Sequence, residues 1–424
     1  MRAGIGPVIV LALAGFAGAA FAQEQPAWLK MAMAAEAVDP EALRKAAEPG
    51  NTEQQKLVAA TELAWQRRDA EAAIALRASA DTAREVALRL DSLNMLMAVH
   101  MRTGHYSLAA AAGRESKALA PPSPGQSDFL TAAEALKDTP SMTQSGNQQG
   151  LLPLRVEKDG IPRAKVSING SDQEAVLDTG AAFSAVSQSV AAKAGVRPLK
   201  ATIRIVPGGG VVSKAGIGVL DKLVMGETTF SNVVVLVLPD DDMDIFGDDA
   251  KVGAIVGLPV FLKMGSIAIL PDGSGQPVFA FRPSAGQPGD ASNMRLHKLS
   301  LIVTGTLKRP EPAAINLLLD TGASATGFYE RFATSFPELV ADARRVTTKS
   351  AVIGEAALSR EARKLGELRF EVGGTSFSLT GANMHDDRRP AYHGILGQDL
   401  LRAGFIADFG AMTFELAPRS KTAN

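Results

Sequence analysis

The stretch Ala175-Val-Leu-Asp178-Thr179-Gly180-Ala181 occurs a second time, slightly changed, as Leu317-Leu-Leu-Asp320-Thr321-Gly322-Ala323. In both copies an apolar run leads into an acid, a hydroxyl and a glycine, which is typical of a buried strand ending in a tight turn. Each copy is followed by two apolar residues and a glycine, Ile255-Val256-Gly257 and Ile395-Leu396-Gly397. The acid-to-glycine separations, 257 − 178 = 79 and 397 − 320 = 77, are nearly equal. The chain is therefore predicted to contain a duplicated lobe.

Each copy supplies one carboxylate, Asp178 in the first and Asp320 in the second, and these are 320 − 178 = 142 residues apart. If the two lobes face each other across a pseudo-twofold axis, the two acids meet. They cannot then both ionise readily, so they share a proton and can activate a water for amide hydrolysis. A glycine after each acid allows close backbone approach, and a threonine can hydrogen-bond across the interface. We expect this support from Thr179, Gly180, Thr321 and Gly322.

An Asp-Thr-Gly-Ala turn after an apolar strand, with a later apolar-apolar-Gly, resembles the retropepsin-like aspartic proteases. The resemblance covers roughly residues 151 to 420. It implies two all-β lobes fused in one chain, Asp178 and Asp320 as catalytic acids, a protein or peptide substrate and no cofactor. Members of this family are often single-lobed homodimers, in which each subunit supplies one lobe. Because both lobes are fused in one chain here, the resemblance implies that a monomer is sufficient for the active site. Pairing of each lobe with its twin in another molecule stays open.

A glycine-rich hairpin is expected between the acid and the later glycine of the first lobe. Two β-branched runs flank Gly208, Gly209 and Gly210, which predicts a flap over a substrate cleft. The alternative is an ordinary glycine-rich turn. The corresponding stretch of the second lobe has the single Gly354, at 354 − 320 = 34 residues from its acid against 209 − 178 = 31 in the first. We therefore expect the two flaps to differ.

Residues 1–22 have the pattern of a secretory signal peptide. Arg2 precedes an apolar run, and Ala20-Phe21-Ala22 forms a small-x-small cleavage site. A membrane anchor is the alternative, but the run is short and consists largely of Ala and Gly, so we expect no stable membrane span. The chain has no cysteine, which excludes disulfides and a lipid-modified N-terminal Cys. Export without disulfides suggests the bacterial periplasm, where a large core can replace them.

The segment 23–137 is rich in Ala, Leu, Glu, Arg and Gln at helical spacing, with breaks at Pro49-Gly50, Arg67-Arg68-Asp69 and Thr103-Gly104-His105. It is predicted to be an all-α domain. Residues 93–121 are similar to one tetratricopeptide repeat, and a generic antiparallel helical bundle is the alternative. In either case the domain offers a surface for a protein partner, or acts as a spacer.

Composition changes at two further places predict the domain boundaries. Residues 138–150 are rich in Thr, Ser, Gln, Asn and Pro, and residues 285–292 in Pro, Gly and Ser, so both are predicted to be linkers. The expected order is a signal peptide at 1–22, a helical domain at 23–137, a linker at 138–150, lobe 1 at 151–284, a linker at 285–292 and lobe 2 at 293–424.

Other chemistry finds little support in the sequence. The net charge is −1 and no Lys/Arg-rich run occurs, so no nucleic-acid partner is indicated. The five histidines include no His-Glu-x-x-His and no pair at zinc-ligand spacing, so no metal site is expected. Two hypotheses remain. One is a periplasmic aspartic endopeptidase, and the other is a non-catalytic binding protein of the same fold whose helical domain recruits partners.

Overall fold

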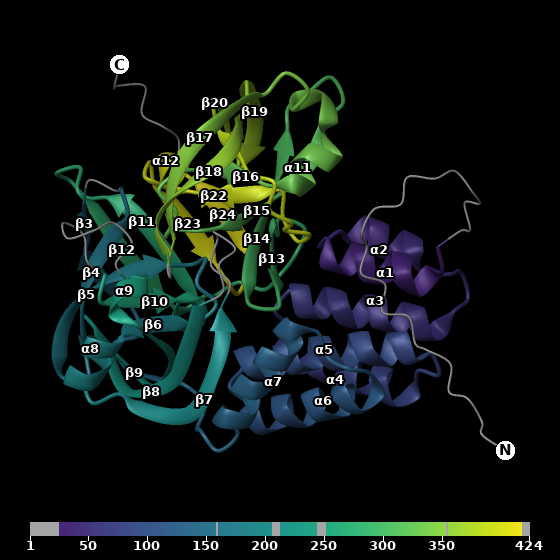
Figure 1. Cartoon of the computed structure of the whole chain (residues 1–424), viewed down its shortest axis with the longest axis horizontal. Coiled ribbons are helices and arrows are strands. Elements are labelled where there is room, and N and C mark those ends of the chain that lie inside the picture. Colours follow the sequence, from purple (N-terminus) through teal and green to yellow (C-terminus); the bar gives the residue numbers. More distant parts are fainter. Residues whose placement is uncertain (1–24, 158–159, 206–212, 244–251, 353–354, 418–424) are drawn as a thin grey trace.

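The computed structural model describes residues 25–157, 160–205, 213–243, 252–352 and 355–417, and it consists of an all-α part followed by two β-rich, barrel-like lobes (Figure 1). The predicted fold class is confirmed. The predicted signal peptide lies outside the described residues. The same holds for the predicted flap residues Gly208, Gly209, Gly210 and Gly354.

The all-α part contains helices α1 (Ala27–Glu36), α2 (Pro40–Ala46), α3 (Thr52–Trp65), α4 (Asp69–Thr82), α5 (Val86–Arg102), α6 (Tyr106–Leu119) and α7 (Pro124–Leu136). Three of the helices begin at side-chain caps, since Asp39, Asn51 and Ser123 each accept a backbone N–H of the first turn. The breaks predicted from the sequence fall between helices. A tetratricopeptide arrangement stays a prediction.

Lobe 1 is a sheet of β1 (Thr143–Gly146), β3 (Arg155–Val156), β4 (Pro162–Ile168), β5 (Ser171–Asp178), β6 (Ser184–Ser187), β7 (Arg197–Ile205), β8 (Ser213–Met225), β9 (Thr228–Leu238) and β10 (Ala254–Gly257), with α8 (Gln188–Lys193), α9 (Asp240–Met243) and α10 (Leu258–Met264). Strand β8 pairs with β7, β4 and β9, so the sheet curls into a barrel. The predicted Asn169-Gly170 hairpin turn joins β4 to β5, and both residues have positive φ, as a tight hairpin requires.

Lobe 2 repeats this plan with β13 (Met294–His297), β14 (Ser300–Leu307), β15 (Ala313–Leu319), β16 (Gly327–Phe328), α11 (Glu330–Ser335), a 3-10 turn (Pro337–Leu339), β17 (Arg344–Val352), β18 (Glu355–Lys364), β19 (Glu367–Val372), β20 (Thr375–Thr380), β21 (Asn383–Met384), β22 (Gly394–Leu396) and α12 (Gln398–Leu401). The equivalence shows in the pairing. Strand β5 runs parallel to β10, and β15 runs parallel to β22. In both lobes the strand leading to the acid therefore pairs with the strand of the apolar-apolar-Gly motif.

A further sheet joins the lobes, in the order β2 (Gly150–Pro153), β12 (Pro277–Arg282), β11 (Ser266–Pro271), β23 (Phe405–Asp408) and β24 (Thr413–Leu416). Lobe 1 contributes β11 and lobe 2 contributes β23, which pair antiparallel from Ser266 opposite Asp408 onwards. One apolar cluster, including Phe279, Phe405 and Phe414, extends through both lobes. The lobes are thus held together by shared backbone hydrogen bonds and a shared core.

The segment predicted to be the first linker differs from expectation. Residues 143–146 form β1, which pairs antiparallel with β9 of lobe 1, and Gly150 begins β2. Strand β1 has one pairing partner, and its side chains are mostly exposed. An exposed edge strand can carry polar residues without loss of core contacts, so its composition resembles that of a linker. The second predicted linker, 285–292, contains no strand or helix.

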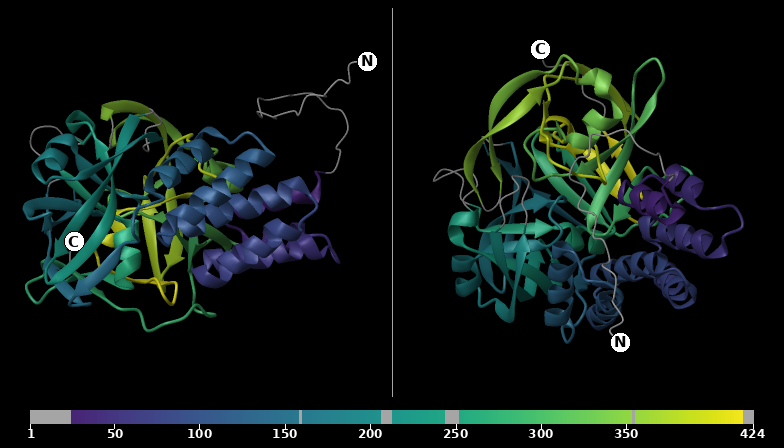
Figure 2. Two further views of the ribbon diagram at one scale, coloured as in Figure 1. Left: turned by 90° about the horizontal axis from the view of Figure 1, so that it is seen from below. Right: turned by 45° about the vertical axis from the view of Figure 1, so that its right-hand side comes forward.

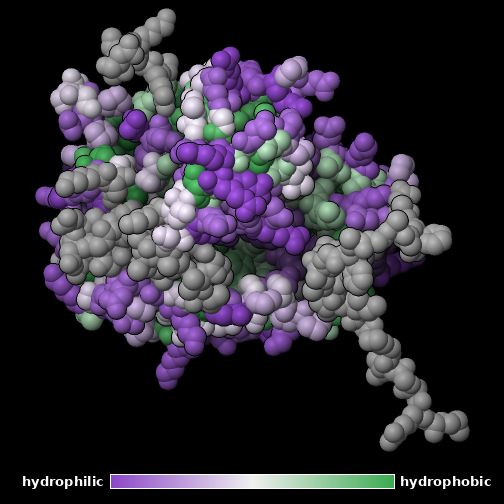
Figure 3. All heavy atoms as spheres, turned by 45° about the horizontal axis from the view of Figure 1, so that its top comes forward, coloured by the Kyte–Doolittle hydropathy of each residue, from purple (hydrophilic) through white to green (hydrophobic). Residues whose placement is uncertain are grey.

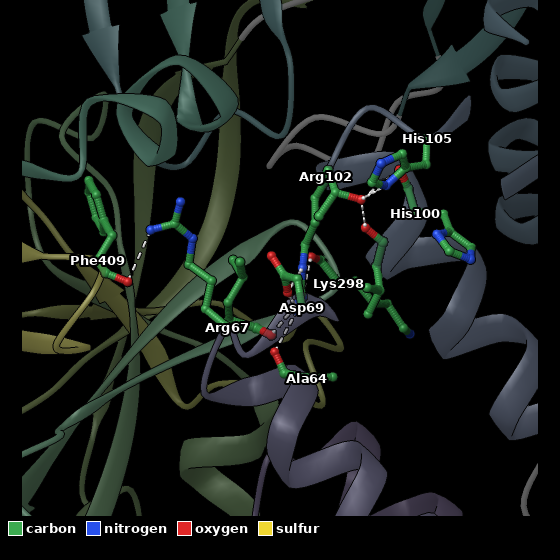
Figure 4. Close-up of polar contacts among 11 residues, drawn as sticks. Ala64, Arg67, Asp69, His100, Arg102, His105, Lys298 and Phe409 are labelled. Carbon is green, nitrogen blue, oxygen red and sulfur yellow. Dashed lines mark hydrogen bonds and ion pairs between the residues drawn. The ribbon is translucent and has the colours of Figure 1, made fainter. Parts of the chain in front are cut away.

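The helical domain packs against both lobes, as the views of Figure 2 show. Arg67, in the connection between α3 and α4, donates to the carbonyls of Leu262 in lobe 1 (2.6 Å) and Phe409 in lobe 2 (3.0 Å). At the end of α5, Arg102 donates to Leu296 O (3.3 Å) and is paired with Asp69 (2.5 Å) (Figure 4). These arginines anchor the helices to the lobes through backbone carbonyls.

Candidate active site

The two acids stand at equivalent positions, each at the end of a buried strand. Asp178 is the last residue of β5, and Asp320 directly follows β15. The residues before them, Leu177 and Leu319, are almost fully buried. Burial of the apolar strand fixes the place of each acid at the end of that strand, where the chain turns.

Four hydrogen bonds of the threonines join the lobes with twofold symmetry. Thr179 Oγ1 donates to Leu319 O (2.7 Å) and accepts from Thr321 N (3.1 Å). In return, Thr321 Oγ1 donates to Leu177 O (2.6 Å) and accepts from Thr179 N (3.0 Å). Both threonines are buried, with exposed fractions of 1% and 2%. Each hydroxyl therefore ties the backbone on either side of the opposite acid, which limits how far the two carboxylates can move apart.

Each carboxylate packs on the glycine of the other copy. A Cβ atom added to Gly180 would lie 2.6 Å from Cγ of Asp320, and one added to Gly322 would lie 2.5 Å from Cγ of Asp178. A side chain at either position would displace the carboxylate of the other copy. The glycines also hold the carboxylate of their own copy, since Gly180 N donates to Asp178 Oδ1 (2.8 Å) and Gly322 N donates to Asp320 Oδ1 (3.0 Å). The structure thus brings both acids and both glycines together.

The electrostatics of the pair are unequal. Burial raises the pKa of both carboxyl groups, and the negative charge of Asp178 raises the pKa of Asp320 further, to well above its usual range. For Asp178 the rise is opposed by hydrogen bonds from Gly180, from the Asp320 carboxyl and from Ala181. Both shifts favour a pair that shares one proton over two ionised carboxylates. As coupled groups they titrate as a pair.

The later glycines of the two motifs have a packing role that is also duplicated. Gly257 N donates to Ser184 Oγ (3.0 Å), and Gly397 N donates to Thr326 Oγ1 (3.1 Å). A Cβ on Gly257 would meet the backbone carbonyl of Phe183 at 2.5 Å. The residue after each glycine then donates to the loop beyond the acid, for example Leu258 N to Ala181 O (2.9 Å). Glycine is required because the loop that carries the acid lies directly on this strand.

Two tyrosines of lobe 2 lie close to Asp320, and the sequence did not point to them. The rings of Tyr329 and Tyr392 meet edge to face, with centroids 5.8 Å apart. Burial raises the pKa of both hydroxyls, and the charge of Asp320 adds to the rise. The weak signal available was that Tyr392 precedes Gly394 of the second apolar-apolar-Gly motif by two residues. Both tyrosines can donate a hydrogen bond at neutral pH.

A cavity of about 1000 Å³ lies beside the turn that follows the first acid. Gly180, Ala181 and Phe183 line it from lobe 1, and helices α1, α5 and α7 line it from the opposite side. Figure 3 shows one face of the molecule, on which a recess with hydrophobic surface lies between hydrophilic rims. The helical domain thus forms a wall of the cavity that Gly180 and Ala181 line, which the sequence did not reveal.

Other kinds of site find no matching residues in the part of the chain that the structure describes. There, no three His, Asp or Glu residues are grouped so that they could hold a metal ion. Within the same residues, no helix is both long enough and apolar enough to cross a membrane.

Comparison with known proteins gives a match within the first lobe. Residues 164–260 match the family model of aspartyl proteases. The matched segment runs from β4 to the start of α10, so it includes Asp178 and Gly257. No curated protein matches the chain. The part of lobe 1 that carries Asp178 is thus similar to aspartyl proteases, and a second β lobe with the same motif follows it.

Proposed function

We propose that the protein is an aspartic endopeptidase whose two lobes, in one chain, form a single retropepsin-like active site. The observation that carries this proposal is the reciprocal packing of the two carboxylates, each against the glycine of the other copy. Both acids, both glycines and both threonines follow one twofold pattern. A binding protein would not need this duplicated acid pair, which is costly to bury.

The geometry supports a general acid-base mechanism. Asp178, as the carboxylate, takes a proton from a water held between the acids, and the water oxygen attacks the carbonyl carbon of the scissile amide. Asp320, as the carboxylic acid, gives its proton to the carbonyl oxygen. Collapse of the tetrahedral intermediate breaks the C–N bond, and the leaving nitrogen receives the proton that Asp178 took up. The carboxyl proton returns to Asp320, so no cofactor is needed.

We place this activity in the bacterial periplasm, on the basis of the signal-peptide pattern and the absence of cysteine. The substrate is a protein or peptide. The helical domain is tied to both lobes by Arg67 and Arg102, so it is proposed to act with the active site as one unit.

The test uses the single variants Asp178→Asn and Asp320→Asn and the double variant. Each single change should reduce hydrolysis of a denatured protein by at least about a thousandfold, and the double change should cost little more, because the two acids act as one unit. A statine-type inhibitor should abolish the wild-type activity. Glu41→Gln, an equal change in charge on the exposed surface of α2, is the matched control. Full activity in either single variant would refute the proposal.

A further inference from the structure

The cavity that Gly180 and Ala181 line is largely apolar, with a few charged residues in its wall. On α5, its wall is formed by Asp91, Asn94, Met95 and Ala98. Their spacing of three and four residues places them on one face of the helix. Across from them lie apolar side chains of lobe 1, among them Phe183. An apolar space with a few convergent polar groups is typical of a binding site, and about 1000 Å³ is at the upper end of common ligand pockets.

The charged groups of this wall are paired except for Asp91. Glu36 is paired with Lys298 (2.8 Å), and Asp128 of α7 is paired with Arg204 of β7 (3.0 Å). Asp91 forms no ion pair with any of the described residues, although it is only partly exposed. Burial and the nearby charge of Glu36 raise the pKa of Asp91 to about 7, against which Lys298 acts. The Asp91 carboxylate is therefore short of a positive charge.

The position of the cavity relates it to one side of the scissile bond. Its lobe 1 wall includes Gly180 and Ala181, two and three residues after Asp178, whereas the residues that follow Asp320 are not part of its lining. A peptide lying across the two acids would pass one of its halves through this cavity. That half would contact the helical domain, because α1, α5 and α7 form the opposite wall.

We propose that the cavity binds the substrate segment on one side of the scissile bond, and that Asp91 pairs there with a lysine or arginine side chain of the substrate. This proposal rests on the proposed function for the identity of the ligand as a peptide. The apolar interior favours aliphatic side chains between the scissile bond and the basic residue. The helical domain is thus a part of the substrate site that selects sequence.

The experiment measures binding apart from hydrolysis, in the full chain with Asp178→Asn to stop turnover. The probes are peptides of one aliphatic sequence in which lysine, or its uncharged counterpart norleucine, is placed at each position in turn. At one position the lysine peptide should bind at least tenfold more tightly than the norleucine peptide. Adding Asp91→Asn should reduce that ratio to about one, whereas adding Glu41→Gln should leave it unchanged.

A second variant tests the cavity without changing charge. Ala32→Leu on α1 adds bulk to the wall and should weaken binding of every peptide in the series at least tenfold, with the lysine preference retained. Circular dichroism of each variant checks that it is folded, and Asp91→Asn, which keeps the size of the side chain, is the variant that decides.

The outcomes separate this proposal from the proposed function. If no peptide binds, if no position prefers lysine, or if the preference survives Asp91→Asn, the role of Asp91 is refuted even when the wild type hydrolyses protein. If the lysine preference depends on Asp91 but the wild type hydrolyses nothing, the binding site stands and the catalytic proposal fails. Wild-type hydrolysis with the same lysine preference in kcat/KM supports both.

Discussion

Replacement of Thr179 by valine should destabilise the pair of lobes far more than the loss of one surface hydroxyl would. The side chain keeps its shape but loses Oγ1, which donates to Leu319 O and accepts from Thr321 N. Both backbone groups are buried at the interface between the lobes. Each buried group left without a partner costs about 1–3 kcal/mol, so the expected loss in free energy of unfolding is about 2–6 kcal/mol. The same change at Thr321 should cost a similar amount.

Urea titration followed by far-UV circular dichroism measures this loss. For a slope of about 3 kcal/mol/M, the midpoint should fall by about 0.7–2 M. Both tryptophans, Trp28 and Trp65, lie in the helical domain, so their fluorescence tests whether that domain unfolds together with the lobes. Thr334→Val is the control, because its exposed hydroxyl donates to Glu330 O on α11, and it should change stability by less than about 0.5 kcal/mol. Equal losses of stability in Thr179→Val and Thr334→Val would refute this explanation.

Three further predictions concern pH and the domain contacts. Ala181→Ser with Ala323→Ser adds a hydroxyl donor near each carboxylate, which lowers the pKa values of the two carboxyl groups. The pH profile of kcat/KM should therefore move towards acid, and an unchanged pH profile would contradict this prediction. Burial lowers the pKa of His393 to about 3, so below pH 6.5 the unfolded state binds a proton that the folded state excludes. Urea unfolding at pH 4 should therefore show about 3 kcal/mol less stability than at pH 7 from this group. The loss should be absent in His393→Gln. Arg102→Met changes a side chain that is only 1% exposed and should lower the free energy of unfolding by about 3–5 kcal/mol in the same assay. The exposed Arg84→Met should lower it by less than about 0.5 kcal/mol. Similar losses in the two variants would argue against the anchoring role of Arg102.

The sequence alone was sufficient for the parts of the fold that depend on local pattern. An apolar strand before Asp178 and Asp320, with a glycine two residues after each acid, predicted the strand and turn at both places. The repeat of that motif with nearly equal spacing predicted two equivalent lobes. The helical part followed from spacing of three and four residues, and Asn169-Gly170 from the requirement for positive φ in a tight hairpin. In all of these the signal lies within a few residues of the feature, or in its repetition.

Tertiary structure alone decided where the helical domain lies and what it does to the cleft. The contacts of Arg67 and Arg102 reach residues about two hundred or more positions away, and they end on backbone carbonyls, which have no sequence signature. In the sequence, Asp91 is indistinguishable from any other polar residue of a helix, and only the fold places the lobe 1 surface opposite it. The polar strand β1 likewise resembled a linker, because an edge strand needs a partner but no apolar side chains. Such features depend on the fit of whole surfaces, and no stretch of sequence encodes that fit by itself.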